Sequence, residues 1–229
     1  PDVPEVVQGV DTVLIDDNAP VETVVEQAKR CPSLAARLVS TANTATFGGK
    51  NWEQNITDLP GAIERLGNLT IKNLVQTDIL KDQFYFKSPA FKQIFEKMWR
   101  NHYMTASLAE KISELTEIGE SNEMYLLGLL HNVGELFLLR VFGELFQRNN
   151  NQLLQMDEVL SNIRDWHTTF GSALITKWNM GNEFALITKH HHDRNYFESE
   201  EADPDLTKKL HVINLASQFT LYMGLSYYK

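Results

Sequence analysis

Four histidines of this sequence stand where apolar side chains are expected. His102 falls on the apolar stripe of a helical pattern, and His131 lies inside the run "LLGLLHNVGELFLL". His190 and His191 belong to "KHHHDR", at the end of another helical pattern. A single buried histidine is most often a core residue bonded to a carbonyl. Imidazole is also the commonest transition-metal ligand, so several on separate helices indicate a core polar network or a metal site.

Carboxylates, which a hydrolytic metal site also needs, are missing from the corresponding places. Catalytic Mg²⁺ and Mn²⁺ are normally held by hard carboxylate oxygens, which also bridge two-metal pairs. Asn132 follows His131 directly, and Asn214 interrupts the apolar run "LHVINLASQF". A neutral amide is a weaker ligand and does not offset metal charge. Glu135 would restore one negative charge only if it points inward, which the pattern does not decide.

Composition indicates an ordinary globular chain. Its 229 residues are 43% apolar and 22% charged. The formal charge of −9 repels phosphate backbones, so we expect no nucleic-acid partner. No apolar run approaches the roughly 20 residues that span a bilayer, and no secretory signal is visible. Cys31 is the one cysteine, which excludes a disulfide within the chain and fits the cytoplasm. Because the chain begins with Pro1, we expect a piece of a longer or processed protein.

Helical periodicity dominates the chain, and strand patterns are nearly absent, so we predict an all-α, multi-helix fold. Proline in the first turn and glycine after the last turn mark several helices. A proline-bearing break near Lys87 divides a helical N-terminal lobe, about 1–87, from a second lobe, about 88–229. The expected helices are 21–30, 32 to the glycines at 48–49, 58–67, 70–84, 89–115, 124–131, 135–149, 157–178 with an interruption or tight packing at Gly171, 183–192 and 208–223.

Several motifs, in order, resemble the HD superfamily of metal-dependent phosphohydrolases. They are "WRNHYMTASLAEKI", "LLGLLHNVGELFLL", "ITKHHHD" and "VINLASQF". The segments "CPSLAARLVSTANTATFG", "ITDLPGAIERLG" and "HTTFGSALITKWNM" narrow the resemblance to the HDOD domain, the HD-related output domain of bacterial signalling proteins. The resemblance covers nearly the whole chain and implies a single HDOD domain over 1–229, whose second lobe is HD-like.

The resemblance also implies which residues lined the original metal pocket. His102 matches the first ligand and His131 the histidine of the His-Asp pair, whereas Asn132 replaces the aspartate. Glu135 stands where active cyclic-dinucleotide phosphodiesterases of the HD-GYP type carry lysine, and the Gly-Tyr-Pro signature is missing. The vestigial pocket is expected to contain His102, His131, Asn132, His190, His191 and Asn214, where Asn214 replaces the final aspartate, with Glu135 and His167 as further contributors.

We therefore interpret the chain as a non-catalytic regulatory module that acts through protein or small-ligand binding. The resemblance implies a signalling partner or domain of unknown identity, and we expect no enzyme activity, no cofactor and no membrane contact. Two alternatives stay open. One is a phosphohydrolase acting on a nucleotide or cyclic dinucleotide through a rearranged histidine site. The other is a metal-binding sensor without catalysis. The pattern does not decide the oligomeric state.

Overall fold

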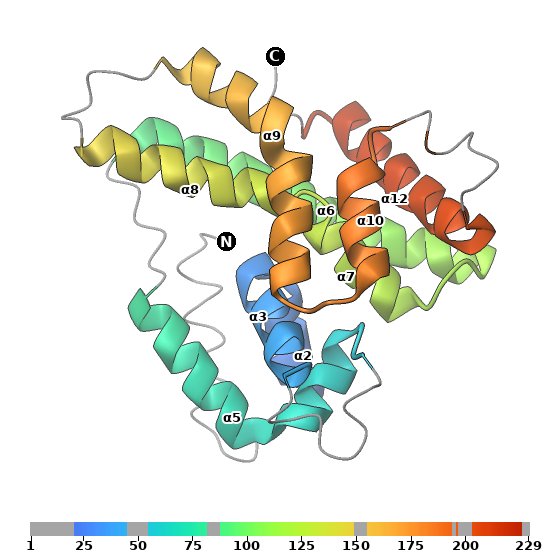
Figure 1. The fold of residues 1–229 in the computed structure, drawn as a ribbon. Coiled ribbons are helices and arrows are strands. Elements are labelled where there is room, and N and C mark those ends of the chain that lie inside the picture. The colour runs from blue at the N-terminus through green and yellow to red at the C-terminus, as the bar shows by residue number, and fades with distance from the viewer. Residues whose placement is uncertain are drawn as a thin grey trace. The chain divides into compact units, whose positions relative to one another are not determined.

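The regular elements of the described residues are all helices, which confirms the predicted all-α fold (Figure 1). A computed structural model describes residues 21–44, 55–81, 88–148, 155–193, 196 and 203–225. The chain divides into two compact units. The first contains Pro1–Gln83 and Thr176–Gly181, and the second contains Phe84–Ile175 and Asn182–Lys229. The first boundary falls near the predicted lobe boundary, but 176–181 was expected in the second lobe.

In the first unit, proline, apolar spacing and side-chain caps shape α2 (Val21–Lys29), α3 (Pro32–Ala42) and α5 (Leu59–Lys81). Helix α3 begins with Pro32 in its first turn, while Cys31 before it makes no capping bond. It ends at Asn43, whose side chain exchanges two hydrogen bonds with the backbone of Ile56, at 3.0 and 2.8 Å. Those bonds stop α3 earlier than predicted, and the expected glycine stop at 48–49 lies outside the described residues.

Helix α5 consists of two helical segments that meet at Gly67. The Asp58 carboxylate accepts a 2.6 Å bond from the Gly61 amide, as expected of an N-terminal cap. Gly67 has φ 71° and ψ 159°, a conformation that side chains disfavour, and interrupts the helical geometry. The predicted glycine stop is therefore present, although the second segment follows without a gap.

The second unit surrounds α7 (Ser121–Leu130), whose residues 123–130 are all buried. Helix α6 (Pro89–Thr116) packs along α7, and α12 (Pro204–Tyr222) contacts both. Helix α8 (Val133–Arg148) follows α7 after a short turn at 131–132 and contacts α6. The remaining helices are α9 (Met156–Lys177) and α10 (Asn182–His190), and α10 contacts α7 and α12.

One stretch, Ser121–Arg148, is apolar and long enough to cross a membrane by length and composition alone. It consists of two helices, α7 and α8, and 78% of its apolar window is buried inside the protein. Packing in the core therefore accounts for its composition.

Helices α8 and α9 approach closely because each carries a glycine at their contact. A Cβ atom on Gly134 would overlap the carbonyl oxygen of His167, and one on Gly171 would lie 2.8 Å from the Thr188 side chain. Helix α9 is continuous through Gly171, so this glycine serves tight packing rather than an interruption. The close contact brings the histidine of α9 towards the turn that precedes α8.

Candidate functional site

Seven polar residues of the second unit gather around the α7–α8 turn. They come from five segments, most of which lie far apart in the sequence, which is why only the folded chain brings them together. Helix α6 contributes His102, the α7–α8 turn His131 and Asn132, the first turn of α8 Glu135, α9 His167, and the turn after α10 His191 and His192.

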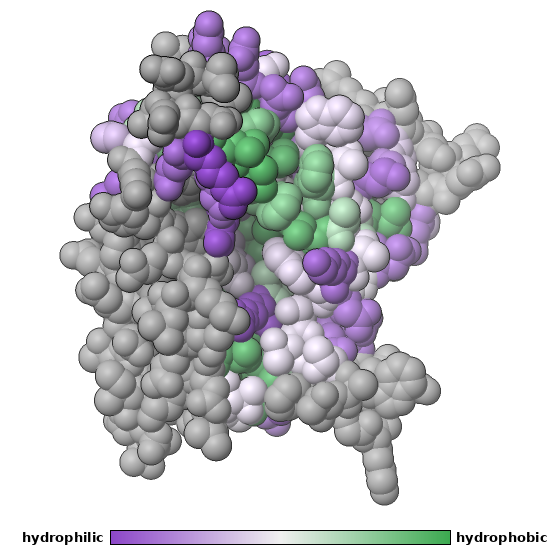
Figure 2. All heavy atoms as spheres, turned by 60° about the vertical axis from the view of Figure 1, so that its left-hand side comes forward, coloured by the Kyte–Doolittle hydropathy of each residue, from purple (hydrophilic) through white to green (hydrophobic). Residues whose placement is uncertain are grey.

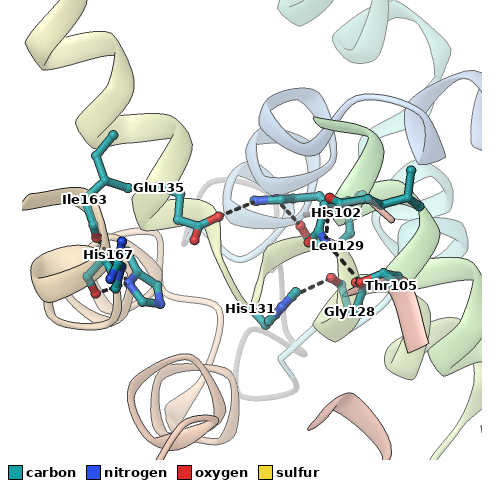
Figure 3. A network of polar contacts seen from close by, with 12 residues as sticks. His102, Thr105, Gly128, Leu129, His131, Glu135, Ile163 and His167 are labelled. Atoms are coloured by element: carbon teal, nitrogen blue, oxygen red, sulfur yellow. Dashed lines mark hydrogen bonds and ion pairs between the residues drawn. The ribbon is translucent and has the colours of Figure 1, made fainter. Parts of the chain in front are cut away.

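Three of these histidines are held in one orientation by backbone carbonyls. The Nδ1 atom of His131 lies 2.7 Å from the Gly128 carbonyl oxygen, and that of His191 lies 2.9 Å from Thr188 O. His167 Nδ1 lies 2.8 Å from Arg164 O and 3.2 Å from Ile163 O, and Figure 3 labels the second of these partners. Because a carbonyl oxygen only accepts hydrogen bonds, each Nδ1 must carry the proton and donate it. In the neutral ring, Nε2 is then a bare lone pair.

These three Nε2 atoms are buried and have no hydrogen-bond partner among the described residues. The ring centroids of His131 and His191 are 5.1 Å apart, and those of His167 and His191 are 5.6 Å apart. Buried polar atoms are normally satisfied, so three neighbouring lone pairs indicate a missing donor or a metal ion. Metal-binding histidines typically show this arrangement, with the other ring nitrogen bonded to a carbonyl.

Burial keeps the rings of His131 and His191 neutral at physiological pH. Loss of solvation, and next the charge of His102, lower the pKa of His131 from 6.5 to about 3. Loss of solvation also lowers the pKa of His191, followed by the effects of His192 and His131. A neutral imidazole is the form that binds a metal ion. The lone pairs are therefore available throughout the physiological range.

His192 joins this group although the sequence analysis did not include it. One ring nitrogen each from His167, His191 and His192 lies within 4.8 Å of the others. The His192 side chain is exposed, yet loss of solvation and the charge of His167 lower its pKa. Its ring centroid is 4.1 Å from that of His191. We call His131, His167, His191 and His192 the imidazole cluster.

Glu135 points inward, towards His102. Both side chains are fully buried, and Nε2 of His102 lies 3.4 Å from the Glu135 carboxylate. Nδ1 of the same ring lies 3.2 Å from Leu129 O and must donate to it (Figure 3). If the ring is neutral, Nε2 can only accept a hydrogen bond, and an ionised carboxylate can also only accept one. The contact between them therefore requires a proton, either on Nε2 of His102 or on the Glu135 carboxyl group. Glu135 is thus engaged by His102, whose ring centroid is 6.0 Å from that of His131.

The remaining predicted pocket residues differ in placement. Asn132 is buried, and its side-chain oxygen has no hydrogen-bond partner in the described part of the chain. His190 contacts Asp193 at 3.3 Å and stacks on Tyr196. The side-chain oxygen of Asn214 accepts a 2.7 Å bond from Gln218 on the same helix. The described contacts of His190 and Asn214 are therefore with their own segments rather than with the imidazole cluster.

Comparison with known proteins places the chain in a family. The model of the HDOD domain matches residues 1–194. A curated, uncharacterized protein of Treponema pallidum (strain Nichols) is 22% identical over 200 residues, which make up 84% of this chain. This chain spans only 37% of the length of that relative.

Solved structures share the fold at low sequence identity. The MmoQ response regulator of Methylococcus capsulatus has a TM-score of 0.75 and 14% identity, covering 100% of this chain and 88% of that one. A virulence factor of Campylobacter jejuni has a TM-score of 0.65 and 16% identity, covering 95% of this chain and 78% of that one. Identities this low indicate a shared fold and do not transfer residue roles.

Proposed function

Because the chain belongs to the HDOD domain family, we propose that it is a non-catalytic signalling module whose imidazole cluster binds a transition-metal ion. The family, together with a response regulator of the same fold, indicates a signalling-related HD-like domain. The observation that supports metal binding is the set of three buried, unpartnered Nε2 atoms whose Nδ1 atoms donate to backbone carbonyls.

The donor set indicates which metals fit. Imidazole nitrogens suit Zn²⁺, Ni²⁺, Co²⁺ and Fe²⁺, whereas Mg²⁺ and Mn²⁺ prefer carboxylate oxygens. His167, His191 and His192 would hold the ion, because their ring nitrogens already lie within 4.8 Å of one another. His131 lies beside them as a further donor. A bound ion would act as a Lewis acid and would link α9 to the turn after α10.

The charge of the site argues against hydrolysis of the kind that relies on Mg²⁺, Mn²⁺ or a two-metal pair. Such ions need carboxylate oxygens that hold or bridge them and balance their charge. Asn132 supplies a neutral amide, and the buried carboxylate of Glu135 contacts His102. Asn214 is likewise neutral, and its oxygen is bonded to its own helix. We therefore expect binding of the ion to be read out as a change in stability or association.

Calorimetric titration tests the metal-binding part. The protein without an affinity tag is titrated with Ni²⁺ and with Zn²⁺, and we expect one equivalent of either to bind. His191→Ala should weaken binding at least about tenfold, since it removes a central donor. His211→Ala is the matched control, because His211 is an exposed residue of α12, outside the cluster. Absence of binding, or equal losses in both variants, would refute the proposed site.

A hydrolysis assay tests the non-catalytic part separately. Bis(p-nitrophenyl) phosphate and cyclic di-GMP are incubated with the protein and Mn²⁺, Fe²⁺ or Ni²⁺. We expect no turnover above that of the free ion. Turnover that disappears in His131→Ala would instead establish a phosphohydrolase with a rearranged site.

A further inference from the structure

Large apolar side chains form a continuous stripe along the outer surface of α8 and α9. The stripe contains Phe137, Val141 and Leu145 of α8 and Trp166 and Phe170 of α9, each 36% to 53% exposed. We propose that this surface, the α8–α9 face, is the contact through which two copies of the chain associate. The proposal goes beyond the metal site and does not depend on it.

The face is continuous across both helices. Phe137, Val141 and Leu145 recur every fourth residue, which places them on one side of α8. The rings of Phe137 and Phe170 stack with centroids 6.0 Å apart, joining the α8 stripe to the side chains of α9. Figure 2 brings forward the side on which α8 lies in Figure 1 and shows hydrophobic side chains gathered among hydrophilic ones.

The underlying helix contact keeps the face in one shape. Gly134 and Gly171 allow the two backbones to approach so closely that a Cβ at Gly134 would overlap α9. At this crossing point the two backbones have little freedom to slide, because interiors are packed as densely as crystals. The part of the face around Phe137 and Phe170, which lies at the crossing, is therefore preformed, and less ordering entropy opposes association there.

The size of the face fits a homodimer of modest area. If each of the five side chains has about 200 Å² in total, their exposed fractions leave about 400 Å² of apolar surface. Homodimer interfaces are about 65% apolar, which implies roughly 600 Å² buried per copy. That approaches the roughly 800 Å² per partner of standard stable interfaces.

Charges around the face favour a second copy over a strongly charged partner. The solvent-facing charged side chains of α8 are two arginines, Arg140 and Arg148, and one glutamate, Glu144, which leave the helix one positive charge. The exposed charges of α9 are two basic side chains, at 164 and 177, and three carboxylates, at 157, 158 and 165, which leave the helix one negative charge. The helices thus differ in sign, in a chain whose formal charge is −9.

A two-fold axis brings the same surface of each copy together, so α8 of one copy can face α9 of the other twice. Opposite signs then meet in both halves of the interface. A uniformly basic or acidic partner would be attracted by one helix and repelled by the other. A second copy, which carries both signs in the same arrangement, therefore fits the face better than such a partner.

Analytical ultracentrifugation of the full chain between about 1 and 200 µM tests the proposal. We expect reversible dimerisation, and Trp166→Glu and Phe137→Glu should each raise the dimer dissociation constant at least about thirtyfold, as for interface hot spots. Phe219→Glu is the matched control, because Phe219 is 50% exposed on α12. Circular dichroism confirms that each variant is folded, and Val141→Ser replaces any variant that is not.

Wild-type protein that stays monomeric over this range would overturn the proposal. So would a dimer that persists in the folded α8–α9 variants, or one that dissociates only in Phe219→Glu. Dimers that dissociate in the α8–α9 variants and persist in the control would support it. The measurements are made in EDTA, so their result does not depend on whether the imidazole cluster binds metal.

Discussion

Acidification should destabilise this protein through His131. The ring is buried and neutral in the folded chain, where its pKa is lowered from 6.5 to about 3, mainly by loss of solvation. The unfolded chain therefore binds a proton below about pH 6.5 that the folded chain does not bind until about pH 3. Stability falls as the pH decreases through this window.

The magnitude follows from the two pKa values of His131. Between pH 7 and pH 5, the unfolded ring becomes almost fully protonated while the folded ring stays neutral. Linkage then removes about 2 kcal/mol of unfolding free energy through this one residue. His191, whose pKa is also lowered by burial, adds a loss of the same sign.

Urea denaturation in EDTA, followed by circular dichroism at pH 7, 6 and 5, measures this loss. His131→Leu removes the titrating group and should lose about 2 kcal/mol less than wild type between pH 7 and 5. His211→Gln, which changes an exposed histidine, should follow the wild-type curve. Equal pH dependence of wild type and His131→Leu would refute the reasoning, because the buried ring would then not be the proton-linked group.

Three further perturbations test other features of the site. Glu135→Ala should lower the unfolding free energy by about 3–5 kcal/mol in urea titrations, because it leaves His102 buried without its carboxylate partner; an effect below 1 kcal/mol would contradict this. Gly134→Ala should cost about 3 kcal/mol by thermal denaturation, because the added Cβ meets the backbone of α9; a variant as stable as wild type would show that α8 and α9 can separate. Asn132→Asp should raise Ni²⁺ affinity about tenfold in calorimetry, because it adds a negative charge beside the imidazole cluster. Asn214→Asp should leave the affinity unchanged, because the Asn214 side chain bonds within its own helix. A larger gain in affinity for Asn214→Asp than for Asn132→Asp would place Asn214 at the metal.

The helices could largely be predicted from the sequence because their signals are local. Apolar residues four apart placed the buried stripe of α6, and the observed helix, Pro89–Thr116, agrees with the expected 89–115 to within one residue. The glycine stop at Gly67 was predicted from the same kind of local signal. Helix ends decided by long-range contacts were not predicted, such as the stop of α3 at Asn43, whose side chain bonds Ile56.

Only part of the candidate site could be predicted from the sequence. Periodicity and the HDOD resemblance indicated that His102 and His131 are buried, and both are less than 2% exposed. Neither source of information indicated that His191 pairs with His192 rather than with His190. That choice depends on α10 ending at His190, so that the next two residues turn towards α9.

By itself, the sequence determined the helical class, the family and the absence of aspartate at 132 and 214. Only the tertiary structure decided what the remaining polar groups do. It turned Glu135 towards His102 and left the buried Nε2 atoms of three neighbouring histidine rings without a hydrogen-bond partner among the described residues. The physical reason is that the direction of a ring depends on which carbonyl its Nδ1 can reach and on how closely neighbouring helices approach. Both are set by contacts between residues far apart in the chain.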